Sequence, residues 1–334
     1  MTIRIGMIGS KGIARKKLLP ALARCKKGVL WSVLSREQSS AEECGKEFGA
    51  QGHRIGFSHL DEFLSDEGLD AVIVASPDKL HKEHVLACAA AGKHVLCEKP
   101  FATSVSDANE MAQACKESGV SLGVAYHLRF HDGLRQLHRR IQEGELGTIY
   151  HARAMWSWRA QDSSNWRAHE SLGRWWGLAG VGTHCIDQIL WNLDAAQNPI
   201  LEANSIITSP KFKSPHDEVA SLNLGFASGA VASVTTSVLY DAPSRLEFYG
   251  ENGIARCDGA LATDASGSVR INGKELVYDS KDPYQGEIED FLMAIEEGRT
   301  PEVPGAFGIL NVEALERATG NTALTKRESN QESF

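Results

Sequence analysis

The sequence has no long apolar run and no paired cysteines. Its longest apolar segments are short ones such as AVIVA at 71–75, far below the roughly 20 residues that cross a bilayer. We therefore expect no membrane role. The seven cysteines are scattered, odd in number and never spaced C-x-x-C, and no basic leader with an apolar core precedes them. This pattern predicts a protein of the reducing cytoplasm.

Excess positive charge is also lacking. The chain has 35 Lys and Arg against 43 Asp and Glu, which gives a net charge of −8. A nucleic-acid-binding protein usually needs a basic face, so we expect no nucleic-acid partner. With 334 residues, 42% of them hydrophobic, the chain has about twice the length of one ordinary domain. Two globular domains are expected, with one large domain as the alternative.

The first half alternates short apolar runs with helical stretches. Over residues 1–125, runs such as IRIGMIG, DAVIVAS and KHVLCE are followed by segments such as LHKEHVLACAAAG. This alternation indicates a doubly wound parallel sheet with helices on both faces. The runs are apolar throughout, as is typical of strands covered on both sides. Residues 1–125 are thus predicted to form one α/β domain.

The second half, residues 126–334, has a different rhythm. A helical stretch at 129–147 leads into a strand-like segment at 148–158 and a further helix near 183–193. Several alternating segments then follow one another without helices between them. Ser228-Gly229 is a plausible hairpin turn between two of them. We expect an α/β domain with a mostly antiparallel sheet and a final pair of helices.

The first predicted strand runs into a glycine-containing turn, IGMIGSKGIARK. Such a turn lets backbone amides at a helix N-terminus approach a pyrophosphate. The fingerprint is imperfect, because Lys11 takes the second glycine position and Ala14 the third. A purely structural turn is the alternative. The candidate cofactor-binding residues here are Gly9, Ser10, Lys11, Gly12 and Ile13.

The second predicted strand ends at Ser35 and Arg36. Enzymes that use NAD usually carry an acidic residue here for the ribose 2′-hydroxyl, whereas an arginine suits a 2′-phosphate. Together with Lys11, these two residues favour NADP(H) over NAD(H). The alternative is that Arg36 is a solvated loop residue.

Two more loops follow predicted parallel strands and should face the same crevice. After AVIVA come Ser76, Pro77 and His81, which are expected beside the cofactor. His81 and His84 have helical spacing, but no third ligand is suggested and no metal site is expected. After KHVLC comes Glu98-Lys99-Pro100. A lysine there can stabilise a substrate hydroxyl or its developing alkoxide, although most lysines at strand ends are merely exposed.

Four segments carry a resemblance to a known family: GMIGSKGIA, AGKHVLCEKPFATSVSDANEM, YHLRF and GVGTHCIDQILW. With them the chain resembles the Gfo/Idh/MocA oxidoreductases over nearly its whole length. The resemblance implies an N-terminal Rossmann domain and a C-terminal α/β domain with an open, mostly antiparallel sheet. It also implies a homodimer or homotetramer formed through that sheet.

The resemblance assigns roles to individual residues. It implies that Lys99 contacts both the cofactor and the reacting hydroxyl, with Glu98 beside it, and that His184 is catalytic. Asp187 matches an acidic position that binds sugar hydroxyls in several members. The chain departs from the family at Gly180, where many members carry an aspartate that joins the lysine and the histidine.

These residues suggest a mechanism. With a reference pKa near 6.5, His184 can act as general acid or base, while Lys99 orients and polarises the oxygen. Asp187 lies three residues after His184, so on a helix the two share a face, and we expect Asp187 to orient the imidazole or bind a hydroxyl. The remaining candidates for lining the substrate pocket are His127, Arg129 and Trp166.

Three functions remain open from the sequence. The leading one is hydride transfer between NADP(H) or NAD(H) and a sugar, cyclitol or related polyhydroxylated small molecule. The second is an NAD-dependent glycosidase that oxidises its substrate only transiently. The third is a non-catalytic NAD(P)-binding sensor, which the glycine at position 180 makes credible.

Overall fold

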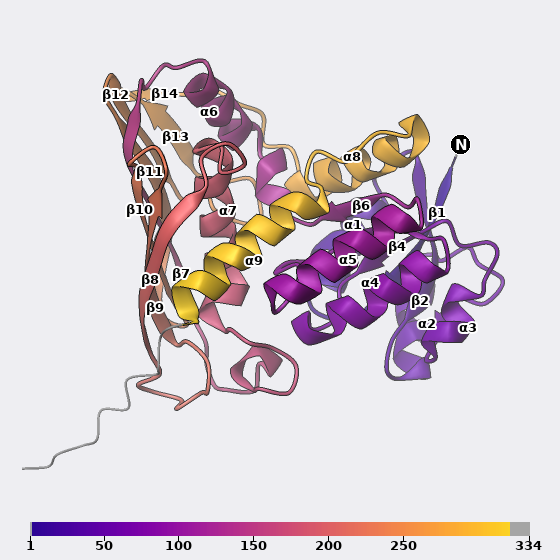
Figure 1. Cartoon of the computed structure of the whole chain (residues 1–334). Helices are drawn as coiled ribbons and strands as arrows, with labels where there is room; N and C mark the ends of the chain where they lie inside the picture. The colour runs from indigo at the N-terminus through magenta and orange to yellow at the C-terminus, as the bar shows by residue number, and fades with distance from the viewer. Residues whose placement is uncertain (1, 321–334) are drawn as a thin grey trace, which may run out of the picture.

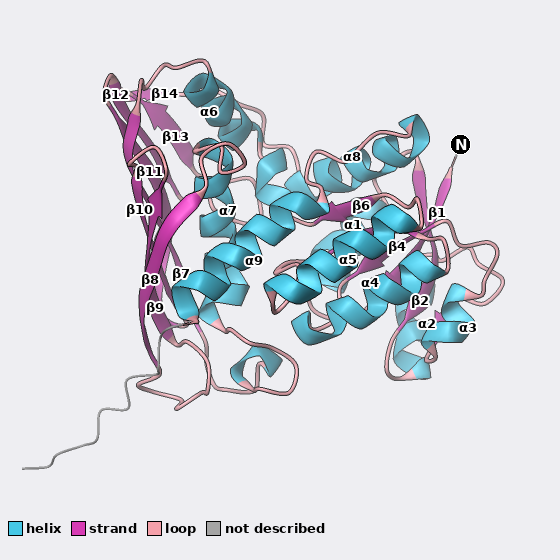
Figure 2. Ribbon diagram, viewed as in Figure 1, coloured by secondary structure: helices cyan, strands magenta, loops and turns pink. Residues whose placement is uncertain are grey.

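The computed structural model describes residues 2–320 and contains two β-sheets with helices packed between and around them (Figures 1 and 2). The first sheet has six strands and the second has eight. The predicted α/β class, with a parallel sheet first and a mostly antiparallel sheet second, is confirmed.

The six-stranded sheet is entirely parallel, in the order β3-β2-β1-β4-β5-β6. This is the strand order of a Rossmann sheet, whose ligands bind where the order reverses, between β1 and β4. The strands are β1 (Ile3–Ile8), β2 (Gly28–Leu34), β3 (Gly56–Phe57), β4 (Ala71–Val74), β5 (His94–Cys97) and β6 (Leu122–Val124).

Helices cover both faces of this sheet, as the apolar runs predict. The wide turn η1 (Ala14–Leu18) leads into α1 (Leu19–Leu22), and the others are α2 (Gln38–Glu47), α3 (Leu60–Leu64), α4 (His81–Ala90) and α5 (Val105–Glu117). One buried cluster forms around Ile5 and Leu18, and another around Val72 and Met111. Each face of the sheet therefore has its own hydrophobic core.

The eight-stranded sheet has the order β14-β13-β12-β11-β7-β10-β9-β8, with every pair antiparallel except β7 and β10. The predicted hairpin around Ser228-Gly229 is present between β9 and β10. The strands are β7 (Ile149–Arg159), β8 (Ile200–Thr208), β9 (Val219–Phe226), β10 (Val231–Ser237), β11 (Leu239–Gly250), β12 (Gly253–Asp258), β13 (Ser268–Ile271) and β14 (Lys274–Glu275).

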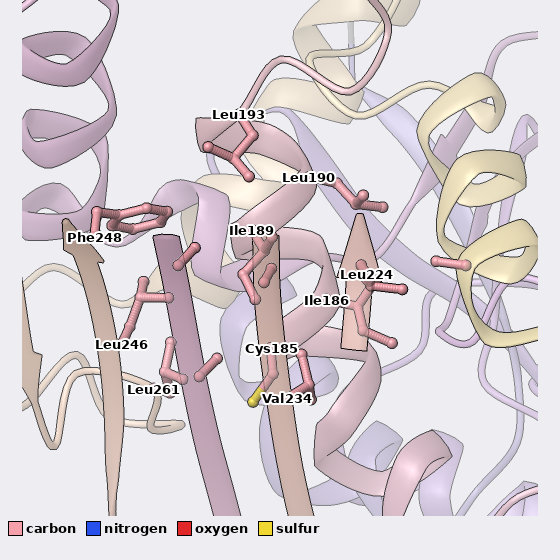
Figure 3. Packing of buried hydrophobic residues seen from close by; sticks show 14 of the residues in the cluster. Cys185, Ile186, Ile189, Leu190, Leu193, Leu224, Val234, Leu246, Phe248 and Leu261 are labelled. Atoms are coloured by element: carbon pink, nitrogen blue, oxygen red, sulfur yellow. The ribbon is translucent and has the colours of Figure 1, made fainter. Parts of the chain in front are cut away.

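Helices α6 (Asp132–Gln142), α7 (Thr183–Asn192) and α9 (Gly305–Thr319) lie on one face of this sheet (Figure 1). Figure 3 shows Cys185 and Ile189 of α7 packed toward Val234 of β10 and Leu246 of β11. Because α7 is buried along almost all of its length, its polar side chains lie inside the protein and not in solvent.

The last two helices return to the first sheet. Helix α8 (Pro283–Glu297) packs on α1 and on the short 3₁₀ turn η3 (His127–Phe130), and Ile288 and Phe291 complete one core of the parallel sheet. Helix α9 contacts α5 on one side and α7 and β8 on the other. Helix α8 therefore packs against the first sheet although it lies in the second half of the chain. A domain boundary between residues 125 and 126 remains a prediction.

None of the helices within residues 2–320 is both long and apolar enough to cross a membrane. All seven cysteines are buried as free thiols.

Candidate active site

Three predicted site segments meet at the carboxyl ends of neighbouring strands. The glycine turn follows β1, Ser76 follows β4 and Glu98-Lys99 follows β5. In a parallel sheet these ends lie along one edge, and the crevice outside that edge is the usual ligand site.

The turn after β1 has the geometry of a close backbone approach. Gly9 has a φ of +112°, and a Cβ there would lie 2.7 Å from the carbonyl oxygen of Ala75. The hydroxyl of Ser10 donates to that of Ser35 over 2.9 Å, which ties the ends of β1 and β2 together. Lys11 and Gly12 are exposed beside them and Ile13 is half-buried. These residues form an open cradle where a pyrophosphate would be expected.

Arg36 points into solvent at the edge of this cradle. Its side chain is 92% exposed and lies 3.4 Å from the carboxylate of Glu37. Such an exposed ion pair contributes little, so the guanidinium remains available to an anionic ligand.

Backbone carbonyls hold the His81 ring, and its place beside the cofactor remains a prediction. It is fully buried, with Nδ1 3.0 Å from the carbonyl oxygen of Pro100 and Nε2 3.0 Å from that of Ser76. It therefore joins the loop that contains Pro77 to the Glu98-Lys99-Pro100 segment. His84 lies 2.9 Å from the Ser76 hydroxyl through its Nδ1. Both histidines thus stabilise the loop after β4 through hydrogen bonds.

Lys99 reaches from the first sheet to the segment just before α7. Its Nζ donates to the carbonyl oxygens of Gly180, at 2.9 Å, and Ala179, at 3.3 Å. Removal from water and, next, the positive charge of Arg167 lower the pKa of Lys99 to about 8, although Glu98 opposes the shift. At neutral pH this amine is still mainly charged, but it can lose a proton within the physiological range.

Glu98 is buried beneath the lysine. Its carboxylate accepts a hydrogen bond from the backbone amide of Lys99 at 3.1 Å. Burial raises its pKa, and the charge of Lys99 partly offsets the effect.

The carbonyls that bind Lys99 belong to η5 (Leu178–Gly182), a wide helical turn that continues into α7. Asp217 caps its start, because its carboxylate accepts from the amides of Trp176 at 2.8 Å and Leu178 at 2.7 Å. Burial raises the pKa of Asp217 to about 7. Asp217 is a positioning residue that the sequence interpretation missed, since no local motif marks it.

Gly180 has a steric reason to be glycine. A Cβ at this position would lie 2.4 Å from the indole of Trp158. The space that an aspartate side chain would need is therefore occupied by this tryptophan.

His184 lies in the first turn of α7 and is 3% exposed. Its ring centroid is 4.8 Å from that of His127, 5.7 Å from that of Trp156 and 6.0 Å from that of Tyr126. Its Nδ1 has no hydrogen-bond partner among the residues that the structure describes. Burial and, next, the charge of Lys99 hold the pKa of His184 well below its usual value, so the imidazole is neutral at pH 7.

A buried hydrogen-bond chain fixes the start of α7. The hydroxyl of Thr183 donates to Oδ1 of Asn311 on α9 over 2.8 Å, so the Tyr126 hydroxyl, 2.8 Å away, donates to Thr183. The amide of Asn311 in turn donates to the Thr183 carbonyl at 2.9 Å. Three distant segments thus position the residue next to His184.

Asp187 does not orient His184. Its carboxylate is bound by Arg129 of η3 through contacts of 2.7 to 3.0 Å, and both side chains are at least 96% buried. The expectation that Asp187 compensates for Gly180 by holding the imidazole is therefore wrong, because the guanidinium already satisfies this carboxylate. Binding of substrate by Asp187 or Arg129 remains a prediction.

Trp166 lies in the loop 160–175, which crosses from the second sheet to the first. The guanidinium of Arg167 stacks 4.1 Å from its ring and pairs at 3.0 Å with Asp78, at the end of the Ser76 loop. The Lys79 amine also donates to the Glu170 carbonyl. The loop therefore brings Arg167 close enough for its charge to lower the pKa of Lys99 and of His184. The sequence interpretation missed this arginine.

The site fits a nicotinamide dinucleotide chemically. Four buried atoms near Lys99 have no hydrogen-bond partner within residues 2–320 and could bind one: Nε2 of His127, Nδ1 of His184 and both carboxylate oxygens of Glu287. Residues 2–320 contain no group of three or more His, Cys, Asp or Glu side chains that could hold a metal ion.

Comparison with known proteins gives two matches to family models. Residues 3–126 match an oxidoreductase family with an NAD-binding Rossmann fold, and residues 134–256 match the GFO/IDH/MocA C-terminal domain.

Individual proteins align over most of the chain. A 1,5-anhydro-D-fructose reductase from Ensifer adhaerens is 29% identical over 92% of both chains. A D-xylose 1-dehydrogenase (NADP(+)) from Haloferax volcanii is 26% identical over 89% of this chain and 90% of its own. An aldose-aldose oxidoreductase from Caulobacter crescentus superposes with a TM-score of 0.87, at 22% identity, over 95% of this chain and 96% of its own.

Proposed function

The chain belongs to the Gfo/Idh/MocA oxidoreductase family, and from this premise we propose that it transfers a hydride between a nicotinamide dinucleotide and a sugar, cyclitol or related polyhydroxylated molecule. The observation that carries the proposal is the contact between Lys99 and the turn that leads to His184. This contact supports an active site in which an amine from the first half of the chain and an imidazole from the second half face one crevice.

Lys99 and His184 have different roles in the reaction. A bound dinucleotide would supply or accept the hydride. In the oxidative direction the neutral His184, whose Nδ1 has no hydrogen-bond partner within residues 2–320, accepts the hydroxyl proton. In the reductive direction the imidazolium returns the same proton, because both directions pass through one transition state. Lys99 orients and polarises the reacting oxygen.

We favour NADP(H) over NAD(H) as the cofactor. Support comes from the exposed guanidinium of Arg36 at the end of β2, with Lys11 and the Ser10–Ser35 pair beside it. An arginine at this position can pair with a 2′-phosphate. The dehydrogenase from Haloferax volcanii is an enzyme named for NADP(+).

The substrate is a small molecule with several hydroxyl groups. Trp156 lies beside His184, and Trp158 lies against Gly180. Aromatic faces of this kind pack on the apolar face of a sugar ring, and His127 supplies a polar edge near them. Relatives named as reductases and dehydrogenases of sugars support this class.

We propose that the protein assembles as a homodimer or homotetramer in the cytoplasm. Val231 and Ile254 are both 49% exposed and each precedes a core residue, Ala232 or Ala255, so they lie on the sheet face that points away from the core. The strand register places them in one row through His151 and Tyr249. Leu201 and Ile206 add further exposed apolar surface on β8. Exposed apolar side chains in a row, bordered by ion pairs such as Arg153–Glu247, support a subunit interface on this face.

The test is a panel of keto-sugars, aldoses and cyclitols assayed with each nicotinamide cofactor at 340 nm, alongside dissociation constants for both reduced cofactors. We expect a net change in NADPH or NADP⁺ with at least one substrate and tighter binding of NADPH than of NADH. Cleavage of a glycoside without net change of cofactor would instead identify a glycosidase. Cofactor binding with no turnover of any compound would identify a sensor.

A further inference from the structure

One face of α8 lies between the cofactor cradle and His184. Tyr284 stacks on the His127 ring at 4.1 Å with an interplanar angle of 11°. The Nζ of Lys17, in the helical turn that follows the cradle, is 5.9 Å from the centre of the Tyr284 ring. Glu287 follows Tyr284 by three residues and therefore lies on the same face. This face thus borders the crevice between the cradle and the reacting pair.

Glu287 has no structural partner. It is 2% exposed, and neither carboxylate oxygen has a hydrogen-bond partner within residues 2–320. Burial of an unpaired carboxyl group costs several kcal/mol, and packing alone does not require it. Asp187, by contrast, is buried with a bidentate guanidinium. An acid left unpaired beside a binding crevice indicates a ligand contact.

The charges around Glu287 decide its protonation. Burial, then the negative charge of Glu98, raises its pKa well above the usual value, whereas the charge of Lys99 lowers it. A further cation beside the carboxyl group would favour its ionised form. The charged groups that act on it are Glu98, Lys99, Asp187 and Asp282. Lys17 and His127 contact Tyr284, which lies one turn earlier on the same helix.

We propose that Glu287 is a cofactor-facing acid that is protonated beside the neutral reduced nicotinamide ring and ionised beside the cationic oxidised ring. The proposal rests on the proposed function, because it requires a nicotinamide dinucleotide in this crevice. Binding of the oxidised cofactor then releases a proton from Glu287, and binding of the reduced cofactor releases none. The carboxyl group thereby links the redox state of the cofactor to the proton content of the site.

Isothermal titration calorimetry in buffers of different ionisation enthalpy tests this linkage. For wild-type protein near pH 7 we expect NADP⁺ binding to release a substantial fraction of one proton, and its Kd to fall by up to about tenfold per pH unit. Glu287→Gln keeps the shape of the side chain and should abolish the release. Glu289→Gln, on the same helix but without a site contact, should retain it. Equal proton release in wild type and Glu287→Gln would overturn the proposal.

A second measurement needs no variant. In the infrared difference spectrum of the wild-type protein, NADP⁺ should remove the carbonyl band of a protonated carboxylic acid, whereas NADPH should not. Binding without loss of this band would overturn the role of Glu287 and leave the proposed function intact. Failure of the wild-type protein to bind either oxidised nicotinamide cofactor would contradict both.

Discussion

The two groups of the reaction centre are held in place by different means. Lys99 follows a parallel strand, and the hydrogen bonds of β5 to β4 and β6 determine where its backbone lies. His184 sits on a helix that is positioned by side chains: the Thr183 chain, the Asp217 cap and the Arg129–Asp187 pair. The lysine end of the site is therefore specified locally, and the histidine end depends on residues scattered along the whole chain.

The largest effect should come from removing either reacting group. Lys99→Ala and His184→Ala should each lower kcat/KM by about 10²–10⁴-fold, the usual contribution of a positioned acid or base. Stability and cofactor affinity should change little. Steady-state kinetics with a substrate found in the panel measures this, with the exposed Lys116→Ala as control. Full activity in His184→Ala would refute its catalytic role.

The histidine end should be sensitive to loss of its ion pair. Asp187→Asn leaves the Arg129 guanidinium buried without a counter-charge, which should lower the free energy of unfolding by about 3–5 kcal/mol. Urea denaturation followed by tryptophan fluorescence measures the change. Glu143→Gln breaks an exposed pair with Arg139 and should cost less than about 1 kcal/mol. Equal losses of unfolding free energy in Asp187→Asn and Glu143→Gln would show that the buried ion pair does not stabilise the histidine end more than an exposed pair does.

An aspartate at position 180, which many family members carry, should destabilise this protein. Gly180→Asp forces the side chain against Trp158 and should destabilise the protein by about 1–3 kcal/mol. Trp158→Ala should relieve this cost, so a double-mutant cycle of unfolding free energies should show a favourable coupling between the two changes. If Gly180→Asp alone were as stable as wild type, Trp158 would not explain the glycine.

The smallest effect per step of the experiment, up to about 1.4 kcal/mol for each pH unit, should appear in the pH dependence of stability. The pKa of Asp217 is about 7 in the folded chain against 3.8 as its ordinary value. The folded protein therefore binds more protons between pH 4 and 7, and this contribution to stability falls as the pH rises through that window, by up to about 1.4 kcal/mol per unit. Asp217→Asn should flatten the profile. An unchanged slope between pH 4 and 7 would rule out this contribution.

The lysine end of the site follows from the sequence because strand, turn and helix patterns are local. The apolar runs predict the parallel sheet, and the parallel sheet brings the turns after β1, β4 and β5 to one edge. Residues that follow parallel strands lie at one edge of the sheet, and the positions of Ser10, Ser35 and Lys99 follow from this rule alone. The rule gives the edge at which His81 lies but not the carbonyl oxygens that its ring contacts.

The histidine end is much less predictable. Asp217 lies some 40 residues after η5 along the chain, and Asn311 lies on a helix more than 100 residues beyond Thr183. Only tertiary packing brings these pairs together. The spacing of His184 and Asp187 places them on one helix face, but Arg129, from η3, takes the carboxylate. Glu287 was missed because burial without a partner leaves no pattern in a sequence.

The most direct test of the account is a crystal structure of the protein with bound NADP⁺. The account predicts that C4 of the nicotinamide lies within contact distance of a site shared by the Lys99 amine and the His184 imidazole, with the pyrophosphate over Gly9–Ile13. A nicotinamide ring bound away from either group would contradict it.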